Sequence, residues 1–159
     1  IKSWKYVGST QPLPNFDPLN ILDKKNENKI KFTREAELQH GRSAMAAIPT
    51  IAFLEQIDKD GSMLGINYLS SLDAYHQAPF WLAMASFELL RMGRGWVNPF
   101  TESKTFYLKQ NYQPGNLGNY NISTISDELL NKELNNGRLA MIAFMGILAQ
   151  ELVTGQNVF

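Results

Sequence analysis

Apolar residues collect in three long segments of this chain, at about 32–57, 75–95 and 127–154, and within each segment they recur with helical spacing. A short link near 58–65 separates the first two segments. A long connection, 98–123, is rich in Pro, Gly and Asn, which interrupt helices. Because no stretch has the alternation and turn of a β-hairpin, the sequence predicts an all-α chain built on three helices.

The first and third segments carry two copies of one motif, which start 96 positions apart at residues 37 and 133. The copies read Glu-Leu-Gln-His-Gly-Arg-Ser-Ala-Met-Ala-Ala and Glu-Leu-Asn-Asn-Gly-Arg-Leu-Ala-Met-Ile-Ala, so seven of the eleven positions are identical. Each copy brings a Glu and an Arg to the start of an apolar run. An unpaired charge there would be costly, and each copy therefore needs a partner.

The spacing inside one copy indicates where that partner lies. Glu37 and Arg42 are about 140° apart around a helix, so they do not meet on their own helix. We therefore predict that the first and third helices cross about a pseudo-twofold axis, with Arg138 paired to Glu37 and Arg42 paired to Glu133. Four small residues would let the backbones approach at the crossing: Gly41, Ala44, Gly137 and Ala140.

The distribution of basic residues favours a membrane protein. The uncharged runs are shorter than the roughly 20 residues of an ordinary span, but the first segment would be about 39 Å long as a helix, enough to cross a bilayer at a tilt. Residues 1–34 hold seven Lys or Arg, and 58–74 hold one. Four more flank or occupy the second connection, and none follows Arg138. This predicts three crossings, with the N-terminal tail on the cytoplasm-like side; Pro49 would fall within the first as a kink.

Composition narrows the class further. With 159 residues, a net charge of +0 and 19% charged residues, the chain is expected to be one domain, 1–159, without a nucleic-acid-binding signature. The absence of Cys excludes disulfides, thiolate zinc sites and iron–sulfur clusters. Two His and no Gly-rich loop between a strand and a helix leave the usual catalytic and nucleotide-binding patterns missing. We therefore predict that the protein is not an enzyme.

Several polar side chains of the repeat offer a lone pair toward apolar surroundings. Glu37 and His40 share a helix face, as do Glu133 and Asn136, and Gln150 lies on nearly the same side as Glu133. A magnesium ion already held by four nitrogens of a flat macrocycle needs only one axial donor, and carboxylate, amide or imidazole groups can supply it. The Arg of the opposite copy would cancel the charge of a Glu ligand.

At these residues the chain resembles the chlorophyll-binding light-harvesting antenna proteins, a three-helix family of plastid thylakoid membranes. Both copies of the Glu-x-x-His/Asn-x-Arg pattern are followed by Ala-Met, in the family's order and separation. The resemblance extends to the Phe-Asp-Pro-Leu sequence at 16–19 and to Leu-Val-Thr-Gly at 152–155, and it covers most of residues 14–156.

The resemblance implies a set of chlorophyll magnesium ligands: Glu37, His40, Glu88, Glu133, Asn136 and Gln150. Arg42 and Arg138 would form the ion pairs between repeats, Arg91 would pair with Glu88, and two carotenoids would lie in the grooves of the crossed helices. Many family members have a Gln eight residues before the middle-helix carboxylate, and this chain has Phe80 at that position. His76 or Gln77, one turn earlier, would then be the ligand in its place. The short tail ending at Phe159, together with Trp81 and Trp96, is closer to red-lineage antennae.

By this resemblance the protein is expected to harvest light with chlorophyll a, an accessory chlorophyll and xanthophylls, and to pass excitation to a photosystem core, with photosystem I favoured. It would be a multi-pass thylakoid protein with a stromal N-terminus, in contact with lipids and neighbouring antenna subunits. Two alternatives stay open. One is a photoprotective member of the same family that dissipates excitation, and the other is a pigment-free helix-pair module that anchors membrane complexes.

Overall fold

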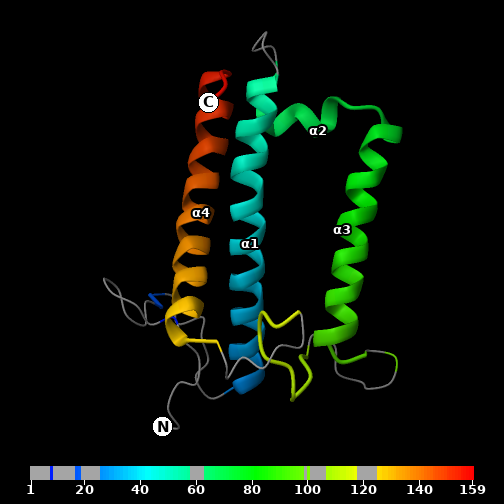
Figure 1. Ribbon diagram of the computed structural model, residues 1–159, viewed down its shortest axis with the longest axis vertical. Helices are drawn as coiled ribbons and strands as arrows, with labels where there is room; N and C mark the ends of the chain where they lie inside the picture. The colour runs from blue at the N-terminus through cyan, green and yellow to red at the C-terminus, as the bar shows by residue number, and fades with distance from the viewer. Residues whose placement is uncertain are drawn as a thin grey trace.

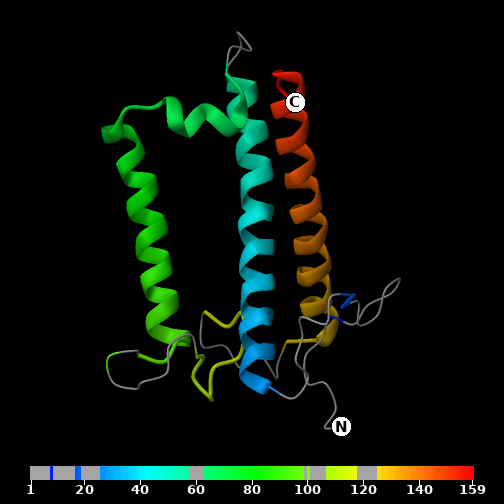
Figure 2. The ribbon, with the colours of Figure 1, turned by 180° about the vertical axis from the view of Figure 1, so that it is seen from behind.

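The computed structural model describes residues 8, 17–18, 26–57, 63–98, 100, 107–117 and 125–159. Three long helices dominate this part of the chain: α1 (Glu27–Ile57), α3 (Ala74–Gly95) and α4 (Asp127–Thr154). The 3₁₀ turn η1 (Gly65–Asn67) and the short helix α2 (Tyr68–Ser71) lead from α1 to α3. In Figure 1, α1 and α4 stand side by side, while α3 stands apart and is joined to them through α2. Figure 2 shows the same arrangement from behind.

The observed helices agree closely with the predicted segments. The third has the predicted bounds, the second begins one residue earlier, and α1 begins five residues earlier, at Glu27. The difference in α1 has a local cause, because Asn26 accepts a hydrogen bond from the Lys29 N–H at 3.3 Å and so caps a first turn made mostly of polar residues. An apolar periodicity does not detect such a turn. Helix α1 continues through Pro49 to Ile57.

Both ends of α4 carry the signals that make its bounds readable from sequence. Ser126 is the N-cap, and its hydroxyl accepts from the Leu129 N–H at 3.4 Å. Gly155 follows the last turn with φ +64°, and its N–H donates to the Glu151 carbonyl at 2.9 Å. A left-handed glycine at this position is a common helix stop.

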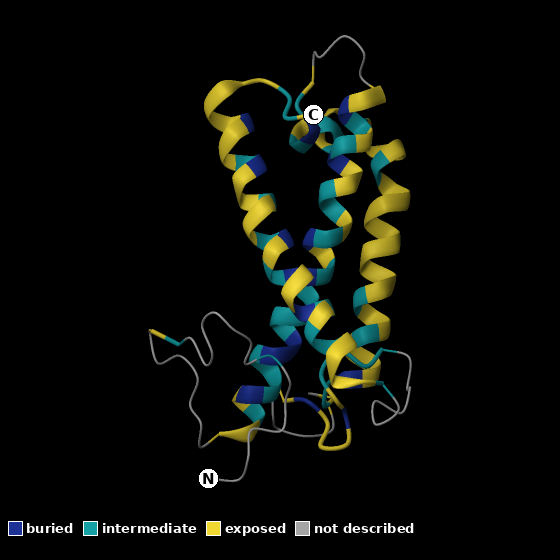
Figure 3. Ribbon diagram, turned by 60° about the vertical axis from the view of Figure 1, so that its left-hand side comes forward, coloured by how far each residue is buried: buried dark blue, intermediate teal, exposed yellow. Residues whose placement is uncertain are grey.

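Helices α1 and α4 make the most extensive contact between elements, and Figure 3 shows them crossing. The two backbones are closest at Gly41 and Gly137. A Cβ added to Gly41 would lie 2.9 Å from the Gly137 Cα, and one added to Gly137 would lie 3.1 Å from the Gly41 Cα. Ala44 and Ala140 are buried beside this point. Small side chains therefore permit the crossing, as expected from the repeat.

Apolar side chains also cover the outside of the helices. Exposed residues cover most of α3 in Figure 3, and the apolar ones include Trp81, Leu82 and Leu89. On α4, Leu139 and Ile142 are 66% and 72% exposed. Large apolar side chains exposed in such number are typical of helices that meet lipid or bound apolar molecules.

Among the described residues, one helix is long and apolar enough to cross a membrane by length and composition, namely α4. Helix α1 has a lower mean hydropathy because charged residues fill its first half, and α3 carries Glu88, Arg91 and Arg94 toward its end. Hydropathy within the described chain therefore marks one crossing, whereas three were predicted.

Candidate functional site

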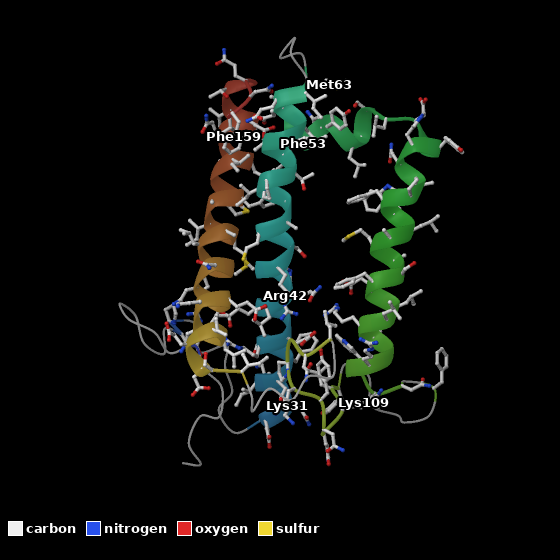
Figure 4. All side chains as sticks on the ribbon, in the orientation of Figure 1. Lys31, Arg42, Phe53, Met63, Lys109 and Phe159 are labelled. Atoms are coloured by element: carbon white, nitrogen blue, oxygen red, sulfur yellow. The ribbon has the colours of Figure 1, made fainter. Side chains whose placement is uncertain are left out.

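Two ion pairs connect α1 to α4 at the crossing. The Arg42 Nε donates to Oε1 of Glu133 at 2.7 Å, and Nη2 forms a salt bridge to the same oxygen at 2.7 Å. Arg138 Nε donates to Oε1 of Glu37 at 2.8 Å. Figure 4 labels Arg42 on α1. Each copy of the motif thus supplies the Arg that neutralises the Glu of the other copy, and the four side chains keep only 28 to 39% of their exposure.

The two pairs are not equivalent. Arg34 Nη1 donates to Oε2 of Glu37 at 3.0 Å, so both oxygens of Glu37 accept from an Arg. Among the described residues, Arg42 alone lies within salt-bridge distance of Glu133, and Arg34 acts on Glu133 only from farther away. The repeat equivalent of Arg34 is Leu130. Glu37 therefore has two cationic partners, whereas Oε2 of Glu133 accepts no hydrogen bond from the described chain.

His40 lies exposed on α1, one turn after Ala36. Its Nδ1 is 2.7 Å from the Ala36 carbonyl oxygen. A carbonyl only accepts, so Nδ1 carries the proton and Nε2 keeps its lone pair. A hydrogen bond from one ring nitrogen that fixes the other for coordination is the usual arrangement in metal-binding His. Asn136 and Gln150 are likewise exposed, on α4.

On α3, Arg91 donates from Nε and Nη2 to Oε2 of Glu88, at 3.0 and 2.5 Å. Oε1 of Glu88 receives neither bond, and the side chain is 39% exposed. One turn into α3, Gln77 uses both ends of its amide, donating to the Leu72 carbonyl and accepting from Trp81 Nε1. The His76 side chain is more available as a ligand, because it is 64% exposed. Its Nδ1 lies 3.8 Å from Oδ2 of Asp73.

Comparison with known proteins identifies the family to which this chain belongs. A family model described as chlorophyll A-B binding protein matches residues 3–152. The chain belongs to this chlorophyll a/b-binding family. Members of the family bind pigments and are not enzymes, so the prediction of a non-enzymatic protein is confirmed.

Named relatives come from several branches of the family. The chain is 35% identical to a fucoxanthin-chlorophyll a-c binding protein of Isochrysis galbana, over 94% of this chain and 77% of that protein. It is 35% identical to light-harvesting complex stress-related protein 1 of Chlamydomonas reinhardtii, over 96% of this chain and 66% of the relative. Chlorophyll a-b binding protein 4 of Arabidopsis thaliana is 29% identical, over 96% and 65%. The fucoxanthin-binding relative is consistent with a red-lineage member.

Glu35, a buried acidic residue on α1, was not predicted from the sequence. Glu35 is 2% exposed, and it accepts from the Gly115 N–H at 2.7 Å and from the Tyr112 hydroxyl at 3.2 Å. Arg91 Nη1 lies 3.4 Å from it. Its repeat equivalent is Asn131, so a search for duplicated charges does not flag it.

A pair of buried acids at the other end of the crossed helices was also missed, although the two residues occupy equivalent positions of the repeat. Glu55 and Glu151 are 96 positions apart, 4% and 0% exposed, and near enough to interact. Glu55 accepts from the N–H groups of Val158 and Phe159, and Glu151 accepts from that of Ile66. These carboxylates hold the segments that cover the helix ends. Figure 4 shows Phe159 at that end, away from Lys31 and Lys109.

Part of the family resemblance falls outside the described residues, namely Phe16 and Leu19 of the Phe-Asp-Pro-Leu sequence. Asp17 and Pro18 lie within the described chain. The remainder of the predicted site lies on α1, α3 and α4.

Burial, followed by the neighbouring charge of Glu35, raises the pKa of the Tyr112 phenol to about 12, from an ordinary value of 10.0. Because the folded state holds this proton more tightly than the unfolded state, the contribution to stability is complete below about pH 10 and is lost as the pH rises from about 10 to 12. The difference in phenolate absorbance between wild type and Tyr112→Phe should therefore develop only near pH 12. A transition near pH 10 would mean that Tyr112 is not held against Glu35.

Proposed function

We propose that this protein is a light-harvesting antenna that holds chlorophylls at fixed positions in the thylakoid membrane and passes excitation to a photosystem core. The observation that carries the proposal is the reciprocal pairing of Glu37 and Glu133 with Arg138 and Arg42. An ionised carboxylate has about four lone-pair positions, so each Glu can pair with an Arg and still offer an oxygen to one magnesium ion. The paired charges make such a ligand tolerable among apolar helices.

The donor chemistry of the remaining residues fits one axial ligand for each chlorophyll. His40 offers Nε2, Glu88 offers Oε1, and Asn136 and Gln150 offer amide oxygens from exposed positions on α4. His76 is the candidate on the first turns of α3. Bound chlorophyll supplies the absorption of light, and the chain's own role is to bind, orient and space the pigments.

We further propose that α1, α3 and α4 each cross the membrane within one domain, 1–159, and that α1 and α4 are related by a pseudo-twofold axis. The exposed apolar surfaces of α3 and α4 support this arrangement. The alternation of basic residues supports it too, and from that alternation we expect a stromal N-terminus. Two xanthophylls would lie in the grooves of the crossing, beside chlorophyll a and an accessory chlorophyll. Photosystem I, neighbouring antenna subunits and lipids would be the partners.

Removing the imidazole of His40 tests the ligand assignment directly. In the complex assembled with chlorophyll a and xanthophylls, His40→Phe should lose one chlorophyll per chain while its helix content stays at the wild-type level, because the ring is exposed and its bond to Ala36 is local. Pigment extraction against protein concentration gives the count. Glu128→Gln, at an exposed surface pair with Lys132, is the control that should lose none. A variant with the full chlorophyll count would refute the assignment.

A dissipating role is the second candidate, because one relative is named a light-harvesting complex stress-related protein. Fluorescence lifetime separates the two roles, since an isolated harvester keeps long-lived chlorophyll emission and a quencher shortens it. The pigment-free anchoring module makes a different prediction. In that case Glu133→Gln would leave a packed amide and change no bound pigment, whereas the antenna proposal expects a changed spectrum.

A further inference from the structure

Glu35 connects three parts of the fold that are distant in sequence: α1, the end of α3 and the 107–117 segment. We propose that Glu35 is a positioning residue for the chlorophyll site on α3, because it fixes Arg91, which in turn fixes the ligand Glu88. This inference rests on the proposed function, since it concerns the placement of one of the pigments assigned there.

Arg91 forms a bridge between two carboxylates with different surroundings. Its Nε and Nη2 donate to Oε2 of Glu88, which is 39% exposed, and its Nη1 donates to Oε1 of Glu35, which is buried. The donors of a guanidinium lie in one rigid plane, so the position of one carboxylate partner restricts the position of the other. Glu35 on α1 therefore sets the orientation of the Glu88 side chain through Arg91. The second oxygen of Glu88 remains available to a ligand.

The other side of Glu35 is held by the connection between α3 and α4. Gly115 donates its N–H at 2.7 Å. Its backbone has φ +83°, and an added Cβ would lie 2.8 Å from a Leu38 methyl carbon, so only glycine allows the approach. Tyr112 donates its hydroxyl to Glu35, and its ring lies against Gly95, where a Cβ would be 2.9 Å from the ring. Both oxygens of Glu35 are thus constrained from outside α1.

This bridge matters because α3 otherwise stands apart from the crossed pair (Figure 1), and its contact with α1 is not among the extensive ones. The Arg91 bond to Glu35 and the edge contact of Phe32 with Trp96, which follows α3, tie that end of α3 to α1. Transfer of excitation depends on the separation and orientation of the pigments. A residue that sets the position of Glu88 relative to α1 therefore sets the coupling of the α3 pigment to those of the pair.

The test compares Glu35→Gln, Glu88→Gln and the double variant, each assembled with chlorophyll a and xanthophylls. Glu35→Gln keeps an acceptor for the Gly115 N–H but removes the charge that holds Arg91. It should lose, or shift in the absorption and circular dichroism spectra, the same chlorophyll that Glu88→Gln affects, and the double variant should show no additional loss. Chlorophylls of the crossed pair should stay. Tyr112→Phe, which removes the hydroxyl that contacts both oxygens of Glu35, should shift the same band less, and Glu128→Gln is the unaffected control.

Two results would overturn the proposal. Glu35→Gln with the wild-type pigment count and spectrum would show that Glu35 does not act on the site. Losses spread over all chlorophylls together with lower thermal stability would show a general structural role. A wild-type chain that binds no chlorophyll would instead refute the proposed function.

Discussion

Gly41→Val is expected to prevent assembly of the pigmented complex. An added Cβ already lies 2.9 Å from the Gly137 Cα, and backbone atoms at a helix crossing cannot rotate away as a side chain does. The two branches of Val add further overlap, so α1 and α4 must separate. Overpacking of this kind costs about 1–3 kcal/mol where side chains can adjust, and more where they cannot. Separation would also lengthen both cross-helix ion pairs, which stand within one turn of Gly41 and Gly137.

The measurement is the yield of chlorophyll-containing monomer after assembly, followed by its thermal loss of pigment circular dichroism. Gly93→Ala is the matched control, because a Cβ on Gly93 meets no atom within 4 Å and alanine suits a helix better than glycine. The control should assemble like wild type. Normal yield and stability in Gly41→Val would mean that the close approach of the two helices is not required.

The second large effect is a difference between two variants that look equivalent in the repeat. Arg42→Leu should destabilise the complex more than Arg138→Leu. In Arg42→Leu, Glu133 loses the one cation within salt-bridge distance among the described residues and keeps only the more distant Arg34, whereas in Arg138→Leu, Glu37 keeps Arg34 at 3.0 Å. Breaking a fully buried pair costs about 3–5 kcal/mol. We expect about 1–3 kcal/mol for Arg42→Leu, because both side chains remain 30% exposed.

Thermal melting of the two variants under identical pigment and detergent conditions checks this ranking. A third variant, Arg34→Leu combined with Arg138→Leu, removes both partners of Glu37 and should lower the melting temperature at least as far as Arg42→Leu. Equal melting temperatures for the two single variants would show that Arg34 does not support Glu37.

Much of this fold could be predicted from the sequence, because the residues that determine it either act on their own helix or occur in both copies of the motif. Capping by Ser126 and Gly155 defines α4 without reference to any other element. The repeat indicates which Arg faces which Glu, since the pairs at Gly41 and Gly137 follow from two copies of one motif. In such a repeat, each copy of the motif supplies the partner residues of the other copy.

The features that escaped prediction lack such a partner. Glu35 depends on Gly115, 80 positions away in a connection with no periodicity, and on a hydroxyl from Tyr112 in the same segment. Arg34 has no counterpart in the third helix, so the inequality of the two ion pairs is visible only in three dimensions. Glu55 and Glu151 could have been predicted as a pair. They align with one another when the alignment of the two copies is continued past the apolar run.

If this protein is an antenna, its crossed helices hold chlorophyll and carotenoid close enough to exchange excitation. The most direct measurement is the fluorescence excitation spectrum of the purified native complex, recorded at chlorophyll emission and compared with its absorption spectrum. We expect carotenoid bands in the excitation spectrum with high efficiency, together with whole-number chlorophyll per chain. A folded, colourless protein purified from pigmented cells would contradict it.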